Sequence, residues 1–284
     1  EAAASVAGAK LLGRRLRLPL LDIVAGFSSP DIAELCARRL VLREQGGGAV
    51  RPATVRLLDP TLEGWDAPAV WDTGTGFSSR DFEQVLAANG LRGFYHHDGP
   101  SWQFFDTVAR EGVHVLPGPA GIQPWEVGSP LRLFLHWAWA GQDQRLTHAA
   151  TLGLGDRGAL IVGPSGSGKS GTTLAGYLNG LASAGDDYVL VEQGSDIVAH
   201  AVFRMFKQDP GGLRRVGLDP ESAGAGELNW HGKHEFDAMT LRPAAFGRRL
   251  RLRAIYLPEI ARLARTRIEP VSAQSAALAL APSA

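Results

Sequence analysis

The chain is poor in the residues that would assign it to several specialised classes of protein. Cys36 is its only cysteine among 284 residues, so no disulfide can form within the chain, and we expect a reducing compartment, the cytoplasm. The formal net charge is zero, which offers no field to attract nucleic acid or an acidic membrane. No apolar run reaches the roughly 18–20 residues that span a bilayer. These absences predict a cytoplasmic protein that acts on neither nucleic acids nor membranes.

What remains is the composition of an ordinary globular protein. Hydrophobic residues make up 45% of the chain and charged residues 20%. The length allows one large domain or two smaller ones. Residues 1–4 contain no initiator methionine and no secretory pattern, and we interpret them as a trimmed or incomplete end.

The most specific stretch of the sequence is a glycine-rich motif, G-x-x-x-x-G-K-[ST], over residues 163–170. In this pattern the glycines let backbone N–H groups turn onto phosphate oxygens, and the following helix adds the positive end of its dipole. Lys169 can reach the β and γ phosphates of a nucleotide, and the Ser170 hydroxyl can bind Mg²⁺. The candidate nucleotide cradle consists of Gly163, Pro164, Ser165, Gly166, Ser167, Gly168, Lys169, Ser170 and Gly171.

The flanking sequence fits such a loop. Residues 159–162 are apolar and predict a buried strand before it, and residues 171–179 predict a helix after it. Residues 146–152 predict another strand, and the turn at 155–158 is too short for a helical crossover, so the two strands should form an antiparallel hairpin. In the common doubly wound nucleotide-binding domains the strand before the loop belongs to a parallel sheet instead. The hairpin therefore predicts a different class of P-loop protein.

Two adjacent acids, Asp186 and Asp187, precede the apolar residues 188–191 shortly after the P-loop helix. Adjacent acids in isolation are often a turn or a helix cap. Beside a nucleotide, one carboxylate can coordinate the divalent ion and the other can accept a proton from an attacking hydroxyl. Their place in the sequence favours this functional interpretation.

Together with His148, the P-loop and Asp186-Asp187 occur in an order and spacing that resemble the HPr kinase/phosphorylase family, which is structurally related to ATP-dependent phosphoenolpyruvate carboxykinase. The resemblance covers roughly residues 146–192 and implies ATP- and Mg²⁺-dependent transfer of phosphate to a serine hydroxyl. By this analogy Asp187 is the general base and Asp186 a metal ligand beside Ser170, although the two acids could exchange roles. His148 would lie beside the transferred phosphate.

Outside that block the resemblance points to a distant branch of the family. Lys207 and Lys233 resemble lysines of this branch and would contact substrate or phosphate. The glycine-rich signature that follows the acid pair in true HPr kinases is absent, and residues 211–226 predict a mobile loop instead. The branch is similar to kinases found beside ribosomally made peptides, including those that phosphorylate the C-terminal serine of lasso peptide precursors.

We therefore expect an α/β protein with an N-terminal α+β domain over residues 1–130 and an HPr kinase-like domain with a mixed sheet over residues 131–284. The predicted activity is that of a Mg·ATP-dependent serine kinase acting on a peptide or small protein. The alternatives are HPr or free serine as the acceptor, or a nucleotide-binding regulatory module that has no acceptor.

Other features leave two interpretations open. Trp125, Trp137 and Trp139 can be core packing or a platform for a nucleobase. Eight arginines lie between residues 242 and 267, and those at 249, 251 and 253 alternate with apolar residues. They can neutralise phosphate or form the wet face of a strand. His96-His97 is a weak metal or acid–base candidate, because adjacent histidines on a strand point to opposite faces. His231-x-x-His234 is a weak metal candidate, because no third ligand is evident.

Overall fold

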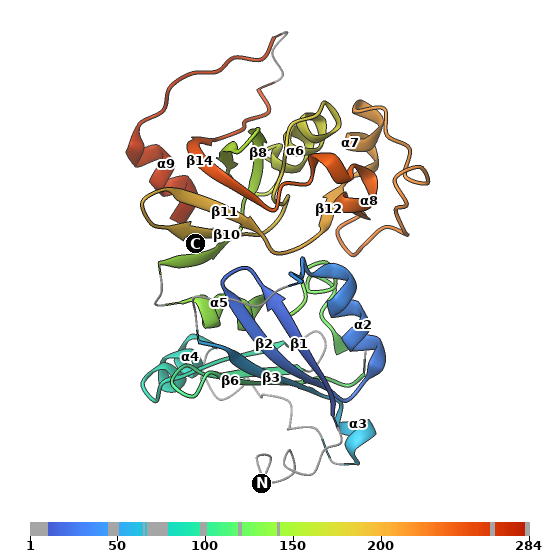
Figure 1. The fold of residues 1–284 in the computed structure, drawn as a ribbon, viewed down its shortest axis with the longest axis vertical. Coiled ribbons are helices and arrows are strands. Elements are labelled where there is room, and N and C mark those ends of the chain that lie inside the picture. The colour runs from blue at the N-terminus through green and yellow to red at the C-terminus, as the bar shows by residue number, and fades with distance from the viewer. Residues whose placement is uncertain are drawn as a thin grey trace. The chain divides into compact units, whose positions relative to one another are not determined.

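The computed structural model of the protein describes residues 11–44, 51–64, 66, 79–96, 101–118, 121–140, 143–261 and 265–281. The chain forms two compact units, Glu1–Ala140 and Gly141–Ala284 (Figure 1). The division falls after helix α5 (Arg132–Trp139), between residues 140 and 141. The boundary predicted from the sequence, between residues 130 and 131, lies before this helix. Both units contain a mixed sheet with helices, so the predicted α/β class is confirmed.

The first unit is built on a six-stranded sheet of order β1-β2-β3-β6-β5-β4. In this sheet β2, β3 and β6 run parallel, and the remaining pairs are antiparallel. Its strands are β1 (Leu12–Leu18), β2 (Leu21–Phe27), β3 (Ala53–Leu58), β4 (Leu91–His96), β5 (Ser101–Asp106) and β6 (Glu111–Val115). Its helices are α2 (Pro30–Arg39), α3 (Pro60–Glu63), α4 (Ser79–Ala87) and α5.

Local sequence explains much of this unit. Leu16 and Leu18 are buried on one face of β1, as the alternation of basic and apolar residues indicates. Helix α2 begins at Pro30 and ends at Arg39, and Ser29 lies at its N-cap without a side-chain capping hydrogen bond. Helix α4 gives way to a turn at Gly90, whose φ of +73° belongs to the left-handed region that glycine adopts without strain.

Trp137 and Trp139 are core residues, and Trp125 is half-buried. Trp137 and Trp139 are buried, and the Trp137 ring packs against Phe105 and Phe134. The third, Trp125, lies against the ring of His96. Packing is therefore the interpretation that applies to them.

The first unit also buries a polar cluster, formed by His96, Gln103, His114 and Glu126. The side-chain nitrogen of Gln103 lies 3.0 Å from both carboxyl oxygens of Glu126 and 3.4 Å from Nε2 of each histidine. Burial lowers the pKa of His114 to about 3 and raises the pKa of Glu126. Desolvation thus favours the neutral form of both groups.

The second unit contains a six-stranded sheet of order β7-β10-β11-β14-β9-β8 and a two-stranded ribbon, β12-β13. In the large sheet only β14 and β9 run parallel. The strands are β7 (Gln144–Thr147), β8 (Ala150–Leu154), β9 (Arg157–Ile161), β10 (Val189–Gln193), β11 (Ile197–Ala201), β12 (Met205–Gln208), β13 (His234–Asp237) and β14 (Arg249–Tyr256). The helices are α6 (Lys169–Leu178), α7 (Pro210–Arg215), α8 (Ala238–Leu241) and α9 (Ala273–Leu280), with a 3₁₀ turn at Pro243–Ala245.

The hairpin before the P-loop is confirmed, because β8 and β9 pair antiparallel from Ala150↔Ile161 to Leu154↔Arg157. The prediction of one strand over 146–152 is wrong. The chain breaks at residues 148–149, since β7 pairs with β10 while β8 pairs with β9, at the opposite end of the strand order. Three chain steps reach about 11 Å, whereas six flat strands extend about 24 Å. The sheet must therefore curl, and His148 lies at the point where the chain changes partners.

Two apolar clusters hold the second unit together. Helix α6 packs beside β8 and β12 (Figure 1), and its Leu174 and Tyr177 join Phe206 and Phe236 of the ribbon. A separate cluster forms around the strands that flank the site, and Leu280 of α9 packs against it.

In the stretch predicted as a loop, 211–226, residues 211–215 belong instead to helix α7. Asp209 caps this helix by accepting from the backbone N–H of Gly212 at 2.8 Å, and Leu213 is buried in the cluster with α6. Among the described residues, no helix has both the length and the apolar character needed to cross a membrane.

Candidate functional site

The P-loop connects the end of β9 to the start of α6. Gly166 and Gly168 adopt φ of +81° and +104°, conformations that a side chain would strain. The Lys169 ammonium turns back to donate to the carbonyl oxygens of Gly163 (2.6 Å) and Pro164 (3.1 Å). Burial lowers the pKa of Lys169, while Asp186 and Asp187 oppose the shift. A buried cation bound only to carbonyls is suited to receive an anion.

Asp186 lies directly before β10 and is buried. Its Oδ2 accepts from the backbone N–H of Lys207 at 3.1 Å, whereas Oδ1 meets no hydrogen-bond partner among the described residues. Burial raises the pKa of this carboxyl to about 6, with repulsion from Asp187 adding to the rise and Lys207 and Ser170 opposing it.

These surroundings fit a magnesium ion. The orphaned Oδ1 of Asp186 and the nearby Ser170 hydroxyl are hard oxygen donors, which Mg²⁺ prefers. Within the part of the chain that the structure describes, no three His, Cys, Asp or Glu side chains form a group that could hold a metal. Magnesium sites in phosphate-transfer proteins are completed by waters and substrate phosphates, so one carboxylate and one hydroxyl suffice.

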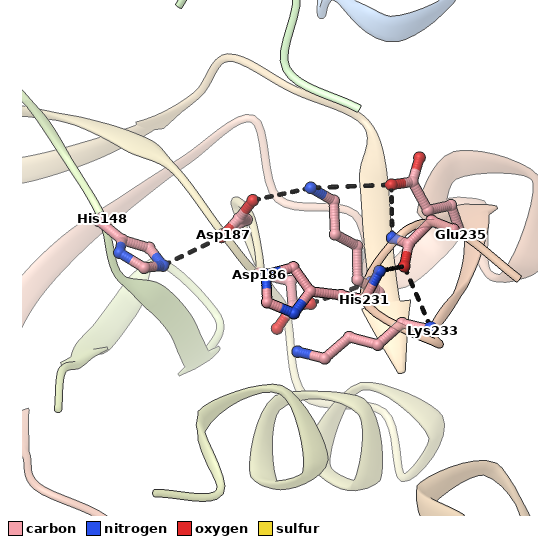
Figure 2. A network of polar contacts seen from close by, with 8 residues as sticks. His148, Asp186, Asp187, His231, Lys233 and Glu235 are labelled. Carbon is pink, nitrogen blue, oxygen red and sulfur yellow. Dashed lines mark hydrogen bonds and ion pairs between the residues drawn. The ribbon is translucent and has the colours of Figure 1, made fainter. Parts of the chain in front are cut away.

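Asp187 is held from two sides (Figure 2). Its Oδ1 lies 3.1 Å from Nε2 of His148, and its Oδ2 accepts from the Lys207 ammonium at 3.0 Å. Burial alone would raise the pKa of Asp187, but the His148 hydrogen bond and the Lys207 charge outweigh it and lower the pKa. This carboxyl is therefore ionised at neutral pH.

Strand pairing brings His148 to this carboxyl. Thr147 at the end of β7 lies opposite Val189 at the start of β10, so the next residues on each side, His148 and Tyr188, meet. Their rings stack with centroids 4.9 Å apart. The sequence predicted His148 beside the transferred phosphate and in the middle of a strand; in the structure it lies beside Asp187, between the ends of two strands.

The ribbon β12-β13 presents different residues on its two faces. Phe206 and Phe236 pair in register and pack toward α6, whereas Lys207 and Glu235 pair on the other face. Glu235 Oε1 lies 3.8 Å from the Lys207 ammonium. Burial lowers the pKa of Lys207, but Asp187 and Glu235 more than compensate, and its pKa rises.

Glu235 is a site residue that sequence reasoning missed. Its strand, His-Glu-Phe-Asp, carries no motif, and only the alternation of Phe236 with polar neighbours hints at a buried and a polar face.

Lys233 precedes the ribbon and extends toward Asp186 (Figure 2). Its charge lowers the pKa of both Asp186 and Lys169. The ammonium forms neither a hydrogen bond nor an ion pair with any residue that the structure describes. The structure thus brings together all the residues predicted for the site, and it leaves the Lys233 ammonium half-buried, with no hydrogen bond or ion pair to any described residue.

The weaker candidates find other roles. The His231 ring lies against Trp230, and Nδ1 of His234 contacts the Gly226 carbonyl oxygen, so the two histidines do not share a ligand position. His96 belongs to the buried cluster of the first unit, and His97 lies outside the described residues.

The arginines of β14 form the wet face of a strand. Leu250 is buried between exposed arginines, as the alternation predicts. Arg251 pairs with Asp156 and Asp196, and Arg253 pairs with Asp196 at 2.9 Å. These exposed pairs favour the solvated interpretation over phosphate binding.

Comparison of the chain with models of known protein families and with curated proteins found no match.

Proposed function

We propose that the protein is a Mg·ATP-dependent kinase that transfers the γ-phosphate to a serine hydroxyl of a peptide. The observation that carries the proposal is the convergence of two sets of groups in one unit. The Lys169 ammonium donates to two P-loop carbonyl oxygens, and the charges of the acid pair act on it. Asp187 is ionised, and Asp186 has one oxygen without a hydrogen-bond partner among the described residues. Such a combination serves phosphoryl transfer, in which positioning and charge neutralisation carry the rate.

Each group has a distinct part in this reaction. The P-loop amides and Lys169 bind the β and γ phosphates, and Ser170 and Asp186 would hold the metal. Bound Mg²⁺ would neutralise charge on the phosphate oxygens. Asp187 orients the serine hydroxyl and takes its proton while His148 and Lys207 fix the carboxylate. A bond forms between the serine Oγ and the γ-phosphorus, the bond to the β-phosphate oxygen breaks, and ADP leaves.

The low pKa of Asp187 is compatible with this role. A carboxylate that stays ionised is a weak base, yet in phosphoryl transfer the transition state is loose and little proton transfer is needed early. Its first task is to orient the hydroxyl. This division of labour supports Asp187 as base and Asp186 as metal ligand, rather than the reverse, because Asp186 lies near Ser170.

The peptide acceptor rests on the resemblance to kinases of ribosomally made peptides, with lasso-type precursors as the expected class. The experiment that tests it offers the protein Mg·ATP labelled on the γ-phosphate together with a peptide ending in serine, HPr, or free serine. We expect label in the peptide, and none with a peptide ending in alanine or with the Lys169→Ala variant. Label in HPr or free serine would change the acceptor. Slow release of inorganic phosphate with no labelled acceptor would instead indicate a nucleotide-binding regulatory module.

A further inference from the structure

One carboxylate of the site, Glu235, contacts both Lys207, which holds the acid pair, and a short loop. On one side Glu235 faces Lys207, which in turn holds Asp187. On the other side its Oε1 accepts from the side-chain nitrogen of Asn229 at 2.9 Å. Figure 2 shows these contacts as one continuous chain from His148 to the loop. The loop, residues 229–233, is therefore tied to the site through a single side chain.

Asn229 fixes the shape of this loop. Its Oδ1 accepts from the backbone N–H groups of His231 (3.0 Å) and Lys233 (3.1 Å). Its own backbone N–H donates to the Lys233 carbonyl oxygen at 2.8 Å, and Gly232 supplies the left-handed turn with φ of +66°. Lys233 is thus held by Asn229 through both of its backbone polar groups.

This arrangement places the side chain of Lys233. A lysine side chain loses considerable rotamer freedom when it is half buried, and among the described residues no hydrogen bond or ion pair of its ammonium offsets that cost. Its charge reaches Asp186 and Lys169, which flank the phosphate cradle. A cation kept at this position is suited to bind an anion that arrives there.

We infer that Asn229 and Glu235 are positioning residues, which hold the Lys233 ammonium where it meets the transferred phosphate; this inference rests on the proposed function. Neither residue touches the reacting atoms. Glu235 orients Asn229, Asn229 sets the backbone of Lys233, and Lys233 binds the phosphate. The same Glu235 steadies Lys207 beside Asp187, so one carboxylate aligns the cation for the donor and the base for the acceptor.

The test is a double-mutant cycle on Mg·ATP affinity, measured by calorimetry on the full chain. Lys233→Ala should weaken binding by about tenfold, the size expected for one charged hydrogen bond. Asn229→Ala should weaken it by a similar factor, and the double variant should bind no more weakly than Lys233→Ala alone. Losses that multiply, or an Asn229→Ala protein that binds like wild type, would overturn the inference.

Two controls separate positioning from loss of structure. Asn89→Ala removes an exposed asparagine hydrogen bond in the first unit and should leave Mg·ATP affinity unchanged. Glu235→Gln keeps an oxygen that can accept from Asn229 and should lose less affinity than Glu235→Ala. Equal affinities in Glu235→Ala and wild type would contradict the role of Glu235.

The outcomes also distinguish the inference from the proposal beneath it. A wild-type protein that binds Mg·ATP but phosphorylates no acceptor contradicts the kinase, while the cycle still decides whether Asn229 acts through Lys233. A wild-type protein that does not bind Mg·ATP overturns both.

Discussion

Both units bury a group of titratable side chains, but burial has different results in the two groups. In the first unit, burial drives His114 and Glu126 toward their neutral forms around the amide of Gln103. In the second unit, burial is outweighed at Asp187, because His148 and Lys207 hold the carboxylate in its ionised form. Neutral buried groups stabilise a fold at little electrostatic cost, whereas charges kept in place are available for chemistry. The contrast separates a polar core from a candidate active site.

The largest expected effect on the rate of phosphoryl transfer comes from removing the negative charge of Asp187. Asp187→Asn leaves His148 and Lys207 without their shared anion, so we expect the rate of phosphoryl transfer to fall by about 10³-fold, within the range for loss of an acid–base group. The matched variant is Glu126→Gln, which removes a carboxyl whose pKa burial raises and should leave the rate close to wild type. Initial rates of ADP formation with a peptide acceptor measure both. Equal losses in the two variants would remove the distinction between the two clusters.

The second expected effect is a pH dependence of stability that arises in the first unit. The pKa of His114 falls to about 3 in the folded protein, from about 6.5 in the unfolded chain. Between these pH values His114 is protonated in the unfolded chain but not in the folded protein. The free energy of unfolding therefore falls as the pH drops below about 6.5.

One such proton contributes a slope of up to about 1.4 kcal/mol per pH unit. Glu126 has the opposite sign, since its raised pKa costs stability as the pH rises, but it is present in both wild type and the variant His114→Gln. Urea unfolding between about pH 5 and pH 7 should therefore show a shallower slope in His114→Gln. Identical slopes would mean that His114 titrates normally and that this cluster does not exclude charge.

The smallest expected effect concerns Asp186, an acid of the second unit that burial shifts in the same direction as Glu126 of the first. Asp186 lies in the second unit, yet burial raises its pKa to about 6, so at neutral pH it is ionised at a cost to the fold. Asp186→Asn keeps an oxygen for the Lys207 N–H and should raise the free energy of unfolding of the nucleotide-free protein by about 1 kcal/mol. The same variant should bind Mg·ATP more weakly. A destabilised Asp186→Asn protein would show that the charge is compensated already, and that no metal is needed to balance it.

Sequence predicted the parts of this site that are local or carried by a motif. The P-loop, its following helix and the β8–β9 hairpin could be predicted because turn length, apolar runs and glycine positions act over a few residues. His148, Asp186 and Asp187 were grouped by resemblance, and the pairing of β7 with β10 supplies the physical reason for their meeting.

The contacts that sequence could not predict depend on strand register. Lys207 and Glu235 are 28 positions apart and meet only because β12 and β13 pair as they do. The break at His148 follows from the curl of the sheet, which residues 146–152 do not encode. Gln103, His114 and Glu126 come from two strands and a connecting segment, and no local pattern marks them as partners.

The most direct measurement of the central claim is the stoichiometry of the reaction. Wild-type protein, Mg·ATP and a serine-ended peptide are incubated together, and ADP and modified peptide are quantified by chromatography and mass spectrometry. If the held carboxylate serves phosphoryl transfer, one phosphoserine forms for each ADP, and Asp187→Asn forms almost none. ADP and free phosphate with the peptide unchanged would contradict the assignment of a kinase.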